Sequence, residues 1–141
     1  MQTNGRKRDQ KKMLKFKVWD KEKQVFLKDV YISQDGELYE FSTFTTFRVV
    51  ITYLNSENKK VLKFTGLHDK NGSEIYEGDV LRIKDGLYRV AWNGCFSSFF
   101  MKNLEKDKKY DDLYFLNANY KSAEIIGNIY ENEEFLKNEK N

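Results

Sequence analysis

Few side chains in this chain are of the types that carry nucleophilic or zinc chemistry. The sequence holds one cysteine, Cys95, and one histidine, His68. Nucleophilic catalysis needs an activated serine or cysteine beside a base, and a structural zinc site needs about four cysteine or histidine ligands. Cys95 opens an apolar run and is expected to be a small core or half-buried residue. His68 precedes a tight turn and is expected to be exposed.

Carboxylates are the remaining candidates for metal or acid–base chemistry. Oxygen ligands suit Mg²⁺, and four acids fall close together in the sequence, namely Asp69, Glu74, Glu77 and Asp79. Asp in a turn, however, usually accepts hydrogen bonds from nearby backbone N–H groups, and neither common phosphate-binding glycine loop occurs. We therefore interpret Asp69 and Asp79 as structural, and expect no enzyme activity, no cofactor and no metal site.

Aromatic residues follow basic ones along residues 82–102, which raises the question of nucleic-acid binding. Small barrels bind single strands through exposed aromatic rings beside cationic side chains. Trp92 would be the stacking platform, and the cationic candidates are Arg82, Arg89 and Lys102, with Lys15 and Lys17 on an earlier strand. The alternative interpretation is that these aromatic rings fill the core of a barrel.

The charge distribution weighs against a nucleic-acid partner. The formal net charge is +3. Residues 1–12 carry five bases and one acid, which leaves twenty bases against twenty-one acids, or −1, for the rest of the chain. We expect residues 1–12 to be a disordered basic tail. It is either an added upstream segment or a basic arm that touches nucleic acid.

Turn signals separate short apolar runs through the second half of the chain. Residues 69–72 and 77–79 read as tight turns, Asn93-Gly94 reads as a two-residue hairpin turn, and the runs between them have the length of strands. The residues expected to serve structure in these turns are Asp69, Asn71, Gly72, Gly78, Asp79 and Gly94. Largely buried positions are expected to include Trp19, Ile75, Tyr76, Val80 and Ile126.

These patterns predict a mainly β fold of short antiparallel strands and tight hairpins. Residues 13–136 form one domain, with a hairpin-rich N-terminal subdomain over 13–60. An SH3-like, partly closed barrel is expected over 61–128, because closing a small bent sheet protects its edges. Residues 129–136 are a C-terminal extension, and residues 137–141 are expected to fray.

Three segments carry a resemblance to a known family. Residues 64–81, FTGLHDKNGSEIYEGDVL, are supported by KFKVWD at 15–20 and IIGNIYEN at 125–132. Together they resemble the YopX family, small proteins encoded mainly by phages and prophages, over residues 13–136. The resemblance implies a mostly β fold and a phage context, and it implies no activity. His68 departs from the family pattern, where lysine is usual.

The composition, the predicted fold and the family resemblance together lead to an expectation about function. We expect a non-enzymatic phage accessory protein that binds a host or phage protein, or a small ligand, through aromatic anchors, and that forms a homo-oligomer. The alternative is a nucleic-acid-binding module in phage replication or regulation. An enzyme would require a carboxylate or lysine constellation that the sequence hides.

The cellular setting is predicted from what the composition lacks. One cysteine allows no internal disulfide. No apolar run resembles a signal peptide, and none approaches the roughly 18 residues of a membrane span. We expect a cytoplasmic protein in the bacterial host cell, with no membrane contact.

Overall fold

The computed structural model describes residues 15–45, 48–105 and 113–138. The expected basic tail at 1–12 and the last three residues of the expected frayed end lie outside these ranges. Within them, the chain is built of short strands joined by turns and 3-10 helices, with no element longer than ten residues. The expectation of a mainly β, antiparallel fold is confirmed.

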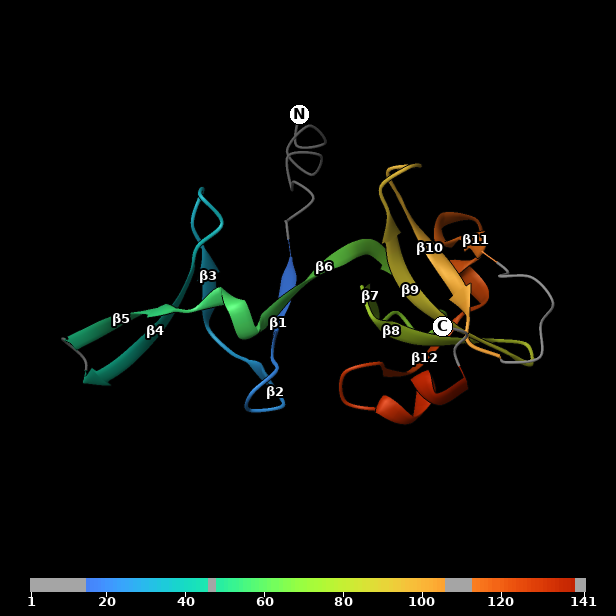
Figure 1. Cartoon of the computed structure of the whole chain (residues 1–141). Coiled ribbons are helices and arrows are strands. Elements are labelled where there is room, and N and C mark those ends of the chain that lie inside the picture. The colour runs from blue at the N-terminus through green and yellow to red at the C-terminus, as the bar shows by residue number, and fades with distance from the viewer. Residues whose placement is uncertain (1–14, 46–47, 106–112, 139–141) are drawn as a thin grey trace, which may run out of the picture.

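The elements follow one another along the chain as short strands with 3-10 helices between or after them (Figure 1). The first group contains β1 (Phe16–Asp20), β2 (Val25–Leu27), β3 (Val30–Ile32), β4 (Leu38–Thr45), β5 (Arg48–Leu54) and η1 (Ser56–Asn58). Next come β6 (Lys59–His68), β7 (Glu74–Tyr76), β8 (Asp79–Ile83), β9 (Gly86–Asn93) and β10 (Ser98–Asn103). The last group contains β11 (Leu113–Phe115), η2 (Leu116–Ala118), η3 (Tyr120–Ser122), β12 (Glu124–Asn128) and η4 (Glu133–Asn138).

These strands form three antiparallel sheets (Figure 1). A central sheet has the order β2-β1-β6-β7, and a five-stranded sheet has the order β11-β10-β9-β8-β12. The third sheet, β3-β4-β5, projects away from the other two, and we call it the arm. Residues 61–65, expected within a C-terminal barrel, belong to β6 and pair with β1 and β7 in the central sheet.

The five-stranded sheet is a meander from β8 to β11, and β12 returns to pair with β8. Antiparallel partners point to the same face of a sheet. Leu81 is therefore on one face with Ile125 and Tyr88, and Val90 shares that face with Met101. This face carries the core, whose fully buried members are Ile75, Leu81, Val90, Met101, Leu116 and Ala123.

Four of the five positions expected to be largely buried are buried, namely Trp19, Ile75, Tyr76 and Val80. Ile126 is only half-buried. The ladder between β8 and β12 shifts between Ile125 and Gly127, so Ile126 lies at a bulge where the regular alternation of sides is interrupted.

The turn between β9 and β10 differs from its prediction. Asn93-Gly94 was expected to be the whole turn, with a strand from Cys95. Instead β9 ends at Asn93 and β10 begins at Ser98, so Cys95 lies exposed in a longer turn. The Asn93 side chain accepts the backbone N–H of Cys95 at 2.9 Å, and Ser97 has a φ of 47°. This asparagine makes an Asx turn, which competes with continuation of the strand.

Two turn glycines of the central motif have left-handed backbones. Gly72 has a φ of 84° and Gly78 a φ of 86°, which side chains with a Cβ rarely adopt. Gly78 is also closely approached, because a Cβ there would lie 2.5 Å from the Tyr130 ring. Gly78 therefore brings the β7–β8 turn and the C-terminal segment together.

Replacing Gly78 by alanine tests this close approach against a matched control. Gly36 has the same φ of 86° but open space around it. We expect Gly36→Ala to cost about 1–2 kcal/mol of unfolding free energy from backbone strain. Gly78→Ala should cost about 2 kcal/mol more, from overlap with Tyr130. Urea unfolding of both variants measures the difference, and equal losses would show that Tyr130 moves aside freely.

Candidate binding surface

The first acid of the central motif is occupied by the backbone. Asp69 is buried, and its Oδ1 accepts the N–H groups of Asn71 and Ser73, each at 2.9 Å. Its Oδ2 accepts the N–H of Ile125 in β12 at 3.0 Å. Burial alone would raise the pKa of Asp69, but the bonds from Ile125, Ser73 and Asn71 lower it. Asp69 thus ties a tight turn to the last strand of the five-stranded sheet.

The other three acids of the motif have separate partners. Asp79 Oδ2 accepts the backbone N–H of Tyr76 at 2.8 Å, and Glu77 accepts the N–H of Lys63 at 2.9 Å. Glu74 lies 2.5 Å from Lys15 Nζ, and this ion pair lowers the pKa of its carboxyl group. The carboxylates therefore serve local structure and do not converge on one point.

The acid of the opening segment is also structural. Asp20 is buried at the end of β1, accepts the N–H groups of Glu22 and Lys23 at 2.9 Å, and lies 3.4 Å from Lys59 Nζ. The bond from Lys23, helped by those from Glu22 and Lys59, lowers the pKa of Asp20 although burial opposes it. This carboxylate closes the β1–β2 turn and holds it against the start of β6.

The structure separates the residues proposed as one binding surface. Arg89 lies opposite Lys102 in the register of β9 and β10. Arg82 on β8 lies on the same face of the sheet, so all three residues share that face. Trp92 lies on the other face, directly opposite Phe99 in the register. Alternation along β9 accounts for this, because Arg89 and Trp92 are an odd number of residues apart.

Lysine side chains accompany several of the aromatic rings. Lys63 Nζ lies 5.2 Å from the centroid of the half-exposed Trp92 ring, and Lys17 Nζ lies 4.3 Å from that of Tyr76. Both contacts have cation–π geometry. The side chain of Lys17, a candidate for phosphate contact, thus lies over the Tyr76 ring of the same central sheet.

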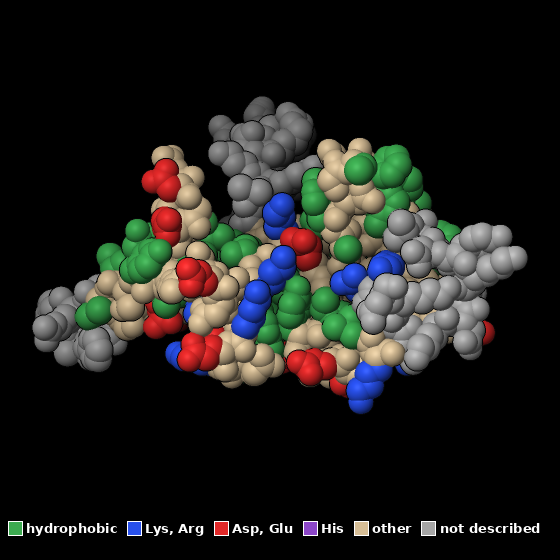
Figure 2. All heavy atoms as spheres, in the orientation of Figure 1, with side chains coloured by type: hydrophobic (Ala, Val, Ile, Leu, Met, Phe, Trp, Pro, Cys, Tyr) green, Lys and Arg blue, Asp and Glu red, His purple; other side chains and the backbone are tan. Residues whose placement is uncertain are grey.

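An exposed aromatic cluster that the sequence did not single out lies at the β9–β10 end of the sheet. We call Phe96, Phe100 and Phe115 the aromatic end. Phe100 pairs with Phe115 in the register, with ring centroids 4.4 Å apart, and Phe96 reaches them from the turn at 5.6 and 6.0 Å. Phe96 is 64% exposed and Phe115 is 44% exposed, while Phe100 is buried. Figure 2 shows hydrophobic side chains gathered over this end of the molecule.

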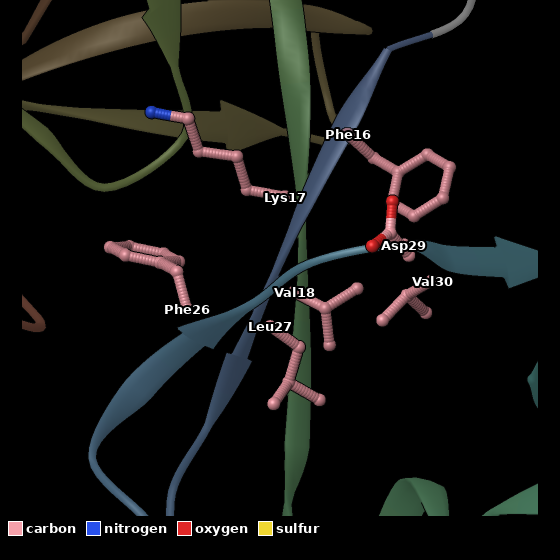
Figure 3. A pocket seen from close by; sticks show the side chains of 7 residues that line it. All are labelled: Phe16, Lys17, Val18, Phe26, Leu27, Asp29 and Val30. Atoms are coloured by element: carbon pink, nitrogen blue, oxygen red, sulfur yellow. The ribbon is translucent and has the colours of Figure 1, made fainter. Parts of the chain in front are cut away.

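A hollow of about 380 Å³ lies beside β1, where the arm joins the central sheet (Figure 3). Phe16, Val18 and Val30 give it an apolar side, and Lys17 and Phe26 point to the other side of the strand. Its charged lining residues, Asp29 and Lys17, lie on opposite sides of β1, so they do not converge as polar groups that orient a small ligand do.

In the described ranges, no three His, Cys, Asp or Glu side chains gather in a way that would hold a metal ion. In the same ranges, no helix has the length and apolar character needed to cross a membrane.

The sheets and turns define a class of mainly β proteins in which a curled five-stranded sheet and a projecting arm are joined by a central sheet. The family model for YopX protein matches residues 15–137, so the chain belongs to the YopX protein family. No curated protein matches it.

Two solved structures are similar in fold. Protein EF1440 from Enterococcus faecalis has 23% sequence identity and a TM-score of 0.57, over 89% of this chain and 99% of that one. Protein YopX from Bacillus subtilis has 20% identity and the same TM-score of 0.57, over 89% of this chain and 97% of that one.

The link between Asp69 and β12 gives a prediction for stability. Asp69→Ala removes the acceptor of three backbone N–H groups and should cost about 3 kcal/mol of unfolding free energy. The exposed turn residue Asp35 is the control, and Asp35→Ala should change stability by about 0.5 kcal/mol or less. Chemical denaturation at pH 7 measures both, and similar losses would contradict the structural role of Asp69.

Asp79 gives a prediction for the dependence of stability on pH. Burial raises the pKa of Asp79 from 3.8 to about 6. A raised pKa means that the folded state favours the protonated acid, so this contribution is complete below pH 3.8 and is lost as pH rises to about 6. Wild type should therefore lose about 3 kcal/mol relative to Asp79→Asn across this window.

Unfolding free energies at pH 3, 5 and 7.5 test this loss, with Asp85→Asn as an exposed control. The control should follow the wild-type profile at every pH. If Asp79→Asn also runs parallel to wild type, the proposed burial penalty at Asp79 is wrong.

Proposed function

We propose that this chain is a non-enzymatic phage accessory protein that binds a protein partner through its aromatic end and works as a homo-oligomer. The observation that carries the proposal is the exposure of Phe96, at 64%, in the β9–β10 turn beside Phe115, which is 44% exposed at the end of β11. Rigid aromatic side chains are favoured anchors of protein interfaces, because they bury much area at little cost in conformational entropy. Contiguous exposed apolar surface is itself a mark of interaction sites.

The charge of the chain supports a protein partner over a nucleic acid. Beyond residue 12 it carries twenty bases against twenty-one acids, and affinity for a phosphate backbone depends on cationic side chains. Arg89 and Lys102 lie on one face of the sheet and the proposed stacking residue Trp92 lies on the other, so these three do not line one groove. Phe100 and Phe115 share the face of Arg89 and Lys102, which is why the experiment below includes a nuclease treatment.

The engaged carboxylates support the non-enzymatic part of the proposal. Asp69, Asp79 and Glu77 each accept backbone N–H groups, and Glu74 is paired with Lys15. The phage setting rests on the family, whose members are expected to be encoded mainly by phages and prophages.

Replacing both exposed rings tests the binding surface. The double variant Phe96→Ser/Phe115→Ser should lose at least about tenfold in partner affinity, since removal of an anchor costs about 2 kcal/mol or more. Val25→Ser is the matched control, because Val25 is a 46% exposed apolar residue on a different sheet. The measurement is native mass spectrometry of gently purified tagged protein from the bacterial host, with and without nuclease.

A defined polypeptide that wild type and Val25→Ser retain, and that the double variant loses, would support the proposal. A discrete small mass on the protein would replace it with ligand binding. Heterogeneous adducts that nuclease removes would replace it with nucleic-acid binding.

A further inference from the structure

The arm presents an open sheet edge that is long for this molecule. Of the strands that end a sheet in the described ranges, β2, β3, β7 and β11 have three residues each and β12 has five. β5 has seven residues and pairs only with β4 in these ranges. It lies along the outside of the arm (Figure 1).

The sequence of β5 lacks the devices that keep sheet edges apart. Natural edge strands are protected by lysine, proline, bulges or short length. β5 reads RVVITYL, with Arg48 as its only charged residue and with neither lysine nor proline. The irregularity in its ladder lies near the tip of the arm, between Thr43 and Thr45 of β4, and leaves residues 50–54 regular. Such an edge is suited to pairing with another strand.

The side chains next to this edge are apolar and largely uncovered. The register places Tyr53 beside Tyr39 and Tyr31, and Ile51 beside Phe41, all on one face of the arm. Ile51 is 59% exposed, Tyr53 is 57% exposed and Tyr31 is 52% exposed. A three-stranded sheet is close to the lower limit for independent stability, so additional strands would stabilise the arm.

We propose that β5 pairs antiparallel with β5 of a second copy across a two-fold axis, giving a continuous six-stranded sheet. This inference specifies the homo-oligomer of the proposed function. When all seven residues pair in reverse order, the central residue Ile51 falls opposite Ile51 of the second copy. Opposite residues in an antiparallel pair point to the same face, so the aromatic faces of the two arms become one surface.

The charge pattern fits a second copy as the occupant. In this register Arg48 falls opposite Leu54, so no like charges meet across the axis. A two-fold axis also requires a self-complementary surface, and a strand whose central residues are uncharged meets that requirement. The interface uses the arm, and the aromatic end at Phe96 lies on the five-stranded sheet and stays open.

A charge placed at the axis tests the pairing. Ile51→Lys puts two ammonium groups opposite each other, and like charges juxtaposed in an interface cost several kcal/mol. We expect wild type to sediment as a dimer and Ile51→Lys to weaken dimerisation by about a hundredfold or more. Val25→Lys carries the same change on an exposed apolar residue of β2 and should remain a dimer. Analytical ultracentrifugation over a range of concentrations gives the dissociation constants.

Cross-linking tests the register itself without a destabilising charge. In a Cys95→Ser background, Ile51→Cys places two thiols opposite each other, within the Cα separation that a disulfide spans. Mild oxidation should give a covalent dimer. Thr52→Cys is the matched control, because in this register Thr52 lies opposite Val50 and not itself, so its yield should be at least about fivefold lower.

A monomeric wild type, or a dimer that survives Ile51→Lys and shows equal cross-linking at both positions, would overturn the β5 interface. These outcomes are separate from the binding test. If a monomeric protein captures a partner through Phe96 and Phe115, the proposed partner binding stands without the β5 interface. If a β5 dimer captures no protein, the β5 interface stands without the proposed partner binding.

Discussion

The architecture depends on one continuous strand, β6, which hydrogen-bonds to two different partners along its length. Residues 59–63 pair with β1, and residues 64–68 pair with β7, with a register shift and a left-handed Gly66 between Phe64 and His68. A strand can change partners in this way only if its ladder bends, and glycine permits the bend. Because β7 leads directly into β8, this strand connects the arm and central sheet to the five-stranded sheet.

Buried carboxylates complete the framework that β6 begins. Asp20 closes the β1–β2 turn near the start of β6, and Asp69 closes the turn after its end while reaching across to β12. Each accepts backbone N–H groups of its own turn through partly buried hydrogen bonds, and loss of such an acceptor is costly. The same residues that look like candidates for metal or acid–base chemistry are therefore used to join elements distant in the sequence, Asp20 to Lys59 and Asp69 to Ile125.

Among the residues that the structure describes, the aromatic end and the edge of β5 are both uncovered apolar surfaces, and they lie on different sheets. The aromatic end is a compact cluster on the five-stranded sheet, with the shape expected of an anchor for another protein. The edge of β5 is linear and offers backbone groups as well as side chains, which suits strand addition. Under the two proposals together, the arm joins copies of this chain and the aromatic end contacts a different molecule.

The sequence alone determined the mainly β class, the family and the turns at residues 69–72 and 77–79, because alternation and turn chemistry act over a few residues. Gly72 and Gly78 have the left-handed conformation that their neighbours Asn71 and Asp79 suggest. Tertiary structure decided which strands pair and which faces meet, since pairing depends on residues far apart in the chain. The strand pairing puts Trp92 and Arg89 on opposite faces of the five-stranded sheet. It also puts residues 61–65 in the central sheet. The exposure of Cys95 has a local cause instead, because the hydrogen bond from its backbone N–H to the Asn93 side chain lengthens the turn and delays the start of β10.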